Sequence, residues 1–178
     1  MPFDASAYGC DAAAILALES NGWRLMALAQ PSYCSAEART RIAAAGAARL
    51  FPGAYGAEAA LAGLLLYFGC WTEAHETAQE ISTAEGSYWH AIVHRQEPDA
   101  SNSRYWFRQV GRHPIFPALH QGAAELGVDF GPQWQPEAFI DLCERARQAP
   151  GSAPEQQARE VQRLEWQLLF DFCARPHA

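Results

Sequence analysis

The sequence contains no lysine. All 13 of its basic residues are arginines, they stand against 20 acidic residues, and the formal net charge is −7. Proteins that bind nucleic acid or an anionic membrane surface usually present a cluster of basic side chains. The chain has no such cluster, so we expect neither nucleic acid nor a membrane among its partners.

The cysteines lack the spacing of a disulfide framework or a zinc ribbon. They are odd in number, lie far apart along the chain and form no C-x-x-C pair: Cys10, Cys34, Cys70, Cys143 and Cys173. Small disulfide-rich domains and zinc ribbons depend on cysteines that occur in characteristic, closely spaced pairs. We therefore expect neither kind of framework in this chain.

Long apolar runs are also missing. The longest spans residues 59–71, which suits a helix in a protein core but falls short of the roughly 20 residues that cross a bilayer. The first residues, MPFDASAYGCD, do not combine a basic region with an apolar run, as a secretory signal does. These features predict a soluble, cytoplasmic protein.

No segment alternates apolar and polar residues with a period of two for long enough to form a sheet. Apolar residues recur instead at helical spacing, most clearly in residues 154–174. With 178 residues, 49% of them hydrophobic, the chain has enough material for one packed core. We expect residues 1–178 to form a single all-α globular domain, an irregular bundle of about seven or eight helices.

Caps and helix breakers place the main helices. The expected segments are residues 36–50, 56–71, 72–81, 87–96, 103–110, 136–148 and 154–174. Because prolines disfavour a helix in the residues before them, Pro114 and Pro117 predict that residues 112–119 are extended or turning. Residues 128–136 are rich in glycine, proline and aromatics, and we expect a loop there that could cover a site.

Residues 85–119 contain most of the residue types that chemistry or recognition requires. His90 and His94 stand four residues apart, so on a helix their rings leave the same face about one turn apart. That spacing can chelate a borderline divalent metal ion such as zinc, nickel or iron. His75, on the preceding helix, is the best third ligand.

Acidic residues near the histidines allow two interpretations. In the first, a carboxylate from Glu85, Glu97 or Asp99 completes a metal site. The first interpretation also has a metal-free form, in which Glu85 works with His90 and His94 in general acid–base catalysis. In the second interpretation, the histidines cap backbone groups or bond to nearby carboxylates in a polar seam that is only structural. The sequence has no H-E-x-x-H pattern that would favour the metal.

Four arginines fall in the same stretch: Arg95, Arg104, Arg108 and Arg112. Guanidinium groups bind carboxylates and phosphates through paired hydrogen bonds, so these arginines could converge on an acidic small molecule. The alternative is a buried arginine–carboxylate network that fastens two short helices, because acidic residues lie between the arginines in sequence. In that network Arg108 would be buried and paired with Glu97 or Asp99.

Two aromatic runs, Tyr88-Trp89 and Tyr105-Trp106-Phe107, accompany the histidines and arginines. Adjacent residues on a helix point about 100° apart, so some of these rings must enter the core while others can line a pocket. We expect Trp106 and Phe107 mostly in the core, and Tyr88 and Trp89 in a pocket wall. The expected ligand-binding residues are Tyr88, Trp89, Arg95, Arg104, Arg108 and His113.

The same stretch resembles a family of bacterial and fungal proteins that carry the run E-G-S-Y/F-W-H-x-I-x-H-R, then E-x-D, then Y-W-F-R-x-V-G-x-H-P. The corresponding residues here are 85–95, Glu97, Asp99 and 105–114. The strong part of the resemblance covers about a fifth of the chain, and it extends more weakly upstream through His75. The resemblance implies where a site lies and implies no mechanism, because no activity is established for the family.

Two hypotheses of different classes follow from these residues. In the first, the chain binds a small, acidic molecule at a site where His75, His90 and His94 hold a divalent metal or act as acid and base. In the second, the chain is a non-catalytic interaction or ligand-binding module, and its polar cluster only stabilises the fold. A metal analysis of the purified protein distinguishes the two.

Overall fold

Helix α4 (Ala57–Tyr67) forms the centre of the computed structural model, which describes residues 3–177. The helix is apolar nearly all round and most of its residues are buried, as expected for a helix enclosed by others. The ring of Trp89 lies directly against Gly63, since a Cβ there would be 2.5 Å from that ring. The indole N–H of Trp166 donates to the Gly63 carbonyl at 2.7 Å. One position without a side chain thus admits two tryptophans from other helices.

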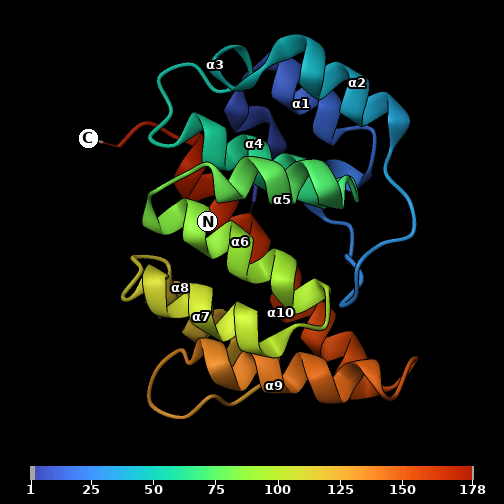
Figure 1. Ribbon diagram of the computed structural model, residues 1–178, viewed down its shortest axis with the longest axis vertical. Helices are drawn as coiled ribbons and strands as arrows, with labels where there is room; N and C mark the ends of the chain where they lie inside the picture. The colour runs from blue at the N-terminus through green and yellow to red at the C-terminus, as the bar shows by residue number, and fades with distance from the viewer. Residues whose placement is uncertain (1–2, 178) are drawn as a thin grey trace.

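The described residues form ten α-helices and two short 3₁₀ helices, η1 and η2, and no strand (Figure 1). In chain order these are η1 (Ala5–Tyr8), α1 (Cys10–Leu16), η2 (Ser20–Gly22), α2 (Ala36–Ala45), α3 (Ala47–Leu50), α4, α5 (Trp71–Gln79), α6 (Ala84–Gln96), α7 (Ala100–Val110), α8 (Phe116–Glu125), α9 (Pro136–Arg147) and α10 (Ala153–Ala174). The expectation of a single all-α domain is confirmed. The helix count exceeds the predicted seven or eight. One reason is Gly46, whose φ of 70° splits residues 36–50 into α2 and α3.

Helix α8 shows that the expectation for residues 112–119 was wrong in its second half. The helix begins at Phe116, with Pro117 in its first turn. Proline is tolerated at that place because the first N–H groups of a helix have no partner within the helix. Pro114 lies before the helix begins, so neither proline prevents it.

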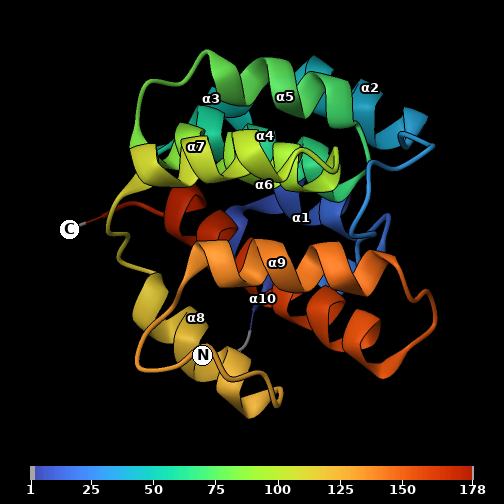
Figure 2. The same cartoon turned by 60° about the horizontal axis from the view of Figure 1, so that its bottom comes forward.

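The helices are arranged around α4 and α10. Helices α5 and α6 pack against each other and against α4, while α7 lies along α6. Helix α9 contacts both α7 and α10, and α8 also packs on α10. Figure 1 shows α1, α2 and α3 at one end of the molecule and α7, α8 and α9 at the other. Figure 2 shows α8, α9 and α10 together on one side of α6 and α7.

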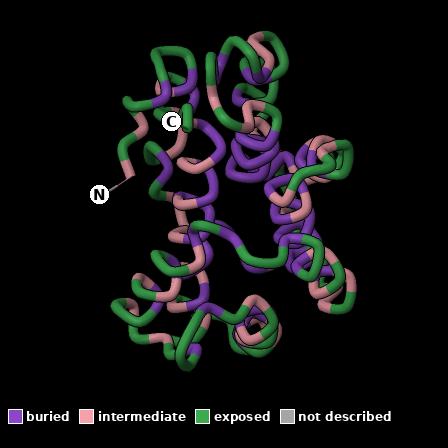
Figure 3. Tube along the Cα trace, turned by 90° about the vertical axis from the view of Figure 1, so that its left-hand side faces the viewer, coloured by how far each residue is buried: buried purple, intermediate pink, exposed green. Residues whose placement is uncertain are grey.

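Buried side chains form two hydrophobic cores, and α10 contributes to both. The larger core surrounds α4 and includes Trp89 of α6 and Phe170 of α10. The smaller core lies between α8, α9 and α10 and includes Phe139 and Val161. Along the chain, buried residues gather where helices face one another, and exposed residues lie on the outer turns (Figure 3). Helix α10 therefore connects the two ends of the molecule.

One disulfide is present, although the cysteine spacing predicted no disulfide framework. It joins Cys34 to Cys70, which are 36 residues apart in sequence. The chain brings them together because the segment before α2 runs beside the end of α4, where the Ser35 N–H donates to the Phe68 carbonyl at 3.0 Å. This long-range contact leaves no trace in the cysteine spacing. Cys10, Cys143 and Cys173 are free thiols.

None of the helices within residues 3–177 combines the length and the apolar character that a membrane crossing requires. The longest, α10, has 22 residues. It carries charged side chains such as Arg159 and Glu160 on one face.

Candidate metal centre

Three histidines meet between α5 and α6. His75 comes from α5, and His90 and His94 leave one face of α6. One ring nitrogen from each lies within 4.8 Å of the other two. The closest pair is His75 Nε2 and His90 Nε2, at 2.7 Å, and the rings of His90 and His94 stack with centroids 4.7 Å apart. The expectation that His75 lies beside the His90/His94 pair is confirmed.

The hairpin of α5 and α6 brings these residues together. Thr83 begins α6 by accepting a hydrogen bond from the Gly86 N–H. Gly86 packs so tightly on the connection that a Cβ there would lie 2.3 Å from the Ile81 carbonyl oxygen. The two helices therefore run back along each other with only a short connection between them. His75, near the middle of α5, comes level with the histidine face of α6.

The histidines lie at the edge of the protein interior. His90 and His94 are buried, while His75 is partly exposed. Burial lowers the pKa of His75 and of His90, and the charge of His94 lowers both further. The pKa of His90 falls to about 4. A metal binds the neutral imidazole, so at neutral pH His75 and His90 are in the form that a metal requires.

Side chains around the cluster restrain the two α6 histidines. The Nδ1 atom of His94 lies 2.8 Å from Glu97 Oε2, an arrangement that leaves the Nε2 atom of His94 to serve as a ligand. Asn102 of α7 places its Nδ2 atom 3.2 Å from that Nε2 atom, a contact that an ion bound there would have to replace. The Trp106 ring stacks on His90, with centroids 4.1 Å apart. These contacts limit the rotation of both rings.

The cluster has nearly the dimensions of a metal site. Ligand nitrogens about 2.0–2.1 Å from a tetrahedral ion lie about 3.3 Å from one another. The Nε2 atoms of His75 and His90, 2.7 Å apart, are closer together than this. The ring nitrogens of all three histidines lie within 4.8 Å of one another, so the group as a whole can be wider than a metal site. The rings would have to shift from these positions to hold an ion. Three imidazoles suit zinc, nickel or iron, and three protein ligands leave a position open for water or a substrate.

The carboxylates expected as further ligands lie elsewhere. Among residues 3–177, the only group of metal-ligating side chains with this spacing consists of the three histidines. Glu97 contacts the Nδ1 atom of His94. Asp99 is the N-cap of α7 and accepts a hydrogen bond from the Asn102 N–H. Glu85 is buried next to His113, with Oε1 3.6 Å from His113 Nε2. A role for Glu85 as an acid–base partner of His90 and His94 gains no support from this placement.

The arginines do not converge on one point. Arg95 is fully buried, pairs with Glu165 of α10 and lies over the ring of Phe139 at 4.4 Å. Arg104 pairs with Asp141 of α9. The expected arginine–carboxylate pairing therefore exists, but the partners are not Glu97 and Asp99. The actual partners, Glu165 and Asp141, lie 70 and 37 residues after their arginines. Proximity in the sequence could not indicate them.

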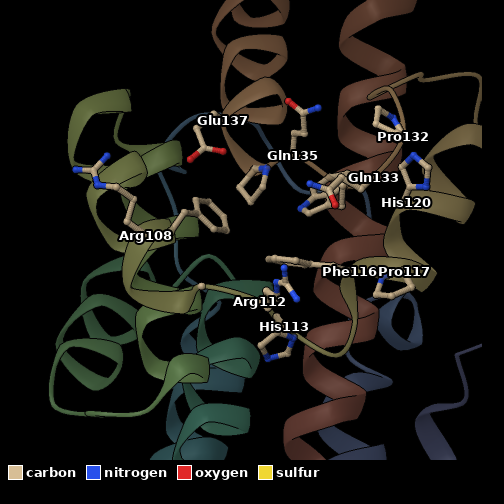
Figure 4. A pocket seen from close by; sticks show the side chains of 14 residues that line it. Arg108, Arg112, His113, Phe116, Pro117, His120, Pro132, Gln133, Gln135 and Glu137 are labelled. Atoms are coloured by element: carbon tan, nitrogen blue, oxygen red, sulfur yellow. The ribbon is translucent and has the colours of Figure 1, made fainter.

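The remaining predicted ligand-binding residues divide between the core and a separate cavity. Tyr88 and Trp89 lie in the larger hydrophobic core and do not line this cavity, although we expected them in a pocket wall. They point inward because α6 is covered on several sides, and the Tyr88 hydroxyl donates to Glu165 at 3.1 Å. Arg108 and His113 line a cavity between α7, α8 and α9 (Figure 4). Arg108 is exposed, and among the described residues it has no carboxylate partner.

Two residues at the histidine cluster were not identified from the sequence. Asn102 contacts His94, and Trp106, which was expected mostly in the core, is only partly buried and covers His90. Phe107, in contrast, is buried as expected. Asn102 and Trp106 stand four residues apart on α7, so the periodicity that selected His90 and His94 would also have placed these two on one face.

The comparisons with known proteins contribute no identification. The chain matches no protein-family model, no curated protein and no solved structure. The resemblance of residues 85–114 to the bacterial and fungal family thus remains a prediction from the sequence.

Proposed function

We propose that the chain binds one divalent transition-metal ion through His75, His90 and His94, and that the ion binds a small molecule at its open position. The observation that supports this proposal is the convergence of three ring nitrogens within 4.8 Å from two adjacent helices. Burial makes neutral imidazoles available at two of the three positions. Zinc, nickel and iron are the ions that this donor set favours.

The site has features of an open metal centre. Only His75 is partly exposed, so solvent and a ligand would approach from the α5 side. His94 would be oriented by Glu97, whose carboxylate fixes the tautomer of the ring. An ion held by three protein ligands can polarise a bound molecule or lower the pKa of a bound water. These properties support a metal-dependent small-molecule site.

The experiment is an elemental analysis of protein purified without a histidine tag. We expect close to one zinc, nickel or iron ion per chain, and loss of that ion when His90→Gln and His94→Gln are combined. Glutamine keeps a hydrogen-bonding group but removes the imidazole nitrogen. The matched control is His177→Gln, because His177 is exposed and bonds to the Phe172 carbonyl, away from the cluster. A parent protein that carries no metal and gains no stability from added divalent ions contradicts the proposal.

A non-catalytic, structural role is the second candidate, and one contact favours it. The 2.7 Å distance between His75 Nε2 and His90 Nε2 is that of a hydrogen bond, so the two rings can satisfy each other without an ion. In that case the cluster is a polar seam that joins α5 to α6. A chelator would then leave the thermal midpoint unchanged, whereas it lowers the midpoint of a metal-bound protein.

The proposed cellular location has to account for the disulfide. The sequence predicts a cytoplasmic protein, but the Cys34–Cys70 bond belongs to the type found mostly in oxidising compartments. Thiol titration of denatured protein isolated from its natural source, under conditions that prevent thiol oxidation and exchange, tests the prediction. Five reactive thiols support the cytoplasmic proposal and three oppose it, because the chain has five cysteines and three of them are free in the structure.

A further inference from the structure

A second candidate site lies on the other side of α7 from the histidine cluster. A cavity of about 1030 Å³ is bounded by α7, the start of α8, the loop before α9 and the start of α9. Its volume is at the upper end of the range of roughly 300–1,000 Å³ that is usual for small-molecule sites. Asn102 and Trp106 face the histidines, whereas Phe107, Arg108 and Gly111 of the same region line the cavity. The two sites are therefore separate.

Aromatic side chains form the apolar part of the cavity wall. Phe107 and Trp134 are almost completely buried, and Phe116 is partly buried. Trp134 is held edge-on against Phe130, with ring centroids 4.8 Å apart. Fixed aromatic rings can stack on a planar or apolar ligand with little loss of side-chain freedom. This part of the wall suits a ligand with an aromatic or similarly apolar body.

The charged part of the wall contains arginines without partners. Neither Arg108 nor Arg112 forms an ion pair with any residue in the described range 3–177, unlike Arg104, one turn before Arg108, which pairs with Asp141. Figure 4 shows Arg112 close to Phe116 in the interior of the view, with Arg108 at the edge and pointing outward. An unpaired guanidinium next to an aromatic wall is suited to a carboxylate, sulfonate or phosphate group.

The backbone around the cavity adds to this preference. Helices α8 and α9 both begin at the cavity, each has a proline in its first turn, and neither has a side-chain N-cap. The partial positive charge of a helix start favours an anion nearby. The loop that lines one side of the cavity is held in place, since a ring nitrogen of His120 lies 2.9 Å from the Gly131 carbonyl oxygen. Residues 132–136 of the loop that was expected to cover a site line this cavity.

His113 contributes to the wall and not to chemistry. Its Nδ1 atom accepts a hydrogen bond from the Ile115 N–H at 3.3 Å, and its Nε2 atom faces the buried carboxylate of Glu85 at 3.6 Å. Both ring nitrogens are therefore directed at protein groups. The cavity holds no second histidine aimed at its centre, because His120 is bonded to the loop. These contacts indicate a binding site and give no reason to expect catalysis there.

We infer that this cavity binds a small organic anion with an aromatic or apolar body, and that Arg112 contacts the acidic group. Glu137 also lines the cavity, on the opposite side from Arg112 in Figure 4. Its carboxylate repels an anion, so it weakens binding without removing the site. The inference does not depend on the histidine cluster.

The test uses two fluorescent probes that share one ring system. 8-Anilinonaphthalene-1-sulfonate is anionic, and N-phenyl-1-naphthylamine is the same body without the sulfonate. We expect the folded chain to bind the anionic probe at one site, and Arg112→Gln to weaken that binding about tenfold, as expected for loss of one hydrogen bond to a charged group. Binding of the neutral probe should not change. Glu137→Gln should tighten binding of the anionic probe, and Arg104→Gln should leave both probes unaffected.

Two further measurements make the result decisive. Arg112 is exposed, and the thermal midpoint of Arg112→Gln checks that the fold is intact. A second variant, Gln133→Glu, adds a negative charge at an exposed position of the cavity rim and should weaken only the anionic probe. The titrations are repeated with a chelator present, so that a failed metal proposal does not affect them. The inference is overturned if the anionic probe does not bind, or if these variants change both probes equally.

Discussion

Arg95 and Glu165 form an ion pair from which solvent is excluded. The Nη2 atom of Arg95 lies 2.5 Å from Oε2 of Glu165, and both side chains are fully buried. Tyr88 donates a further hydrogen bond to the same carboxylate. The pair joins α6, which carries two of the cluster histidines, to α10.

Removal of Arg95 should therefore be costly. Arg95→Met leaves a buried carboxylate without its cation, and we expect a loss of about 3–5 kcal/mol in the free energy of unfolding. Urea unfolding measures it. Arg108→Met is the matched control and should hardly change stability, because Arg108 is exposed and unpaired among the described residues. The double variant Arg95→Met with Glu165→Leu should recover much of the lost stability, because it removes both charges. Equal stabilities for Arg95→Met and Arg108→Met would contradict this interpretation.

The contact between His94 and Glu97 predicts a change in metal affinity. Glu97→Gln removes the carboxylate that orients the ring, and groups in that position typically contribute about 10–100-fold to affinity. We expect the dissociation constant for zinc to rise by at least about tenfold in a calorimetric titration of metal-free protein. Glu80→Gln, at the exposed end of α5, should leave it unchanged. Unaltered zinc affinity in Glu97→Gln would show that Glu97 does not position His94.

The close approach of Trp89 to Gly63 predicts a clash. Gly63→Ala would place a methyl group 2.5 Å from the indole ring, and overpacking of this kind costs about 1–3 kcal/mol. Gly56→Ala is the control, since a Cβ there would meet its nearest neighbour at 3.5 Å. Combining Gly63→Ala with Trp89→Phe should relieve part of the cost. The prediction fails if both alanine variants unfold at the same denaturant concentration as the parent.

Burial of the histidines predicts acid sensitivity of the metal-free protein. The pKa of His90 is lowered to about 4 in the folded state, so below about pH 6.5 the unfolded chain binds a proton more readily than the folded one. The histidine contribution to stability should thus be fully present above pH 6.5 and be lost as the pH falls toward 4. His75 and His113 act in the same direction, because burial lowers the pKa of each. Thermal midpoints measured across this range should depend less on pH in His90→Gln than in the parent.

Local patterns in the sequence were enough to predict much of the architecture. The apolar stripe of α10 and the uniformly apolar α4 identified both helices, since helix formation follows the periodicity of nearby residues. The four-residue spacing of His90 and His94 predicted a shared face. A short connection to α5 was then enough to bring His75 beside them.

The predictions that failed depended on contacts between distant parts of the chain. Arg95 pairs with a residue 70 positions away, and the disulfide spans 36 positions, so neither partner could be read from local spacing. Arg108, His113 and the loop at residues 128–136 were each expected at a site, but their meeting at one cavity was not predicted, because it combines residues of α7, α8 and the loop before α9. Local sequence gives the faces of helices, but tertiary packing decides which faces meet.

The membership of α10 in both hydrophobic cores affects how the protein can form during synthesis. Helix α10 leaves the ribosome after the other nine α-helices of the described residues, and neither core can close before it does. Until then, α4 and α6 on one side and α8 and α9 on the other expose apolar surface that only α10 can cover. Nascent chains that stop before residue 153 should therefore be good substrates for chaperones, and both ends of the molecule should become resistant to protease together.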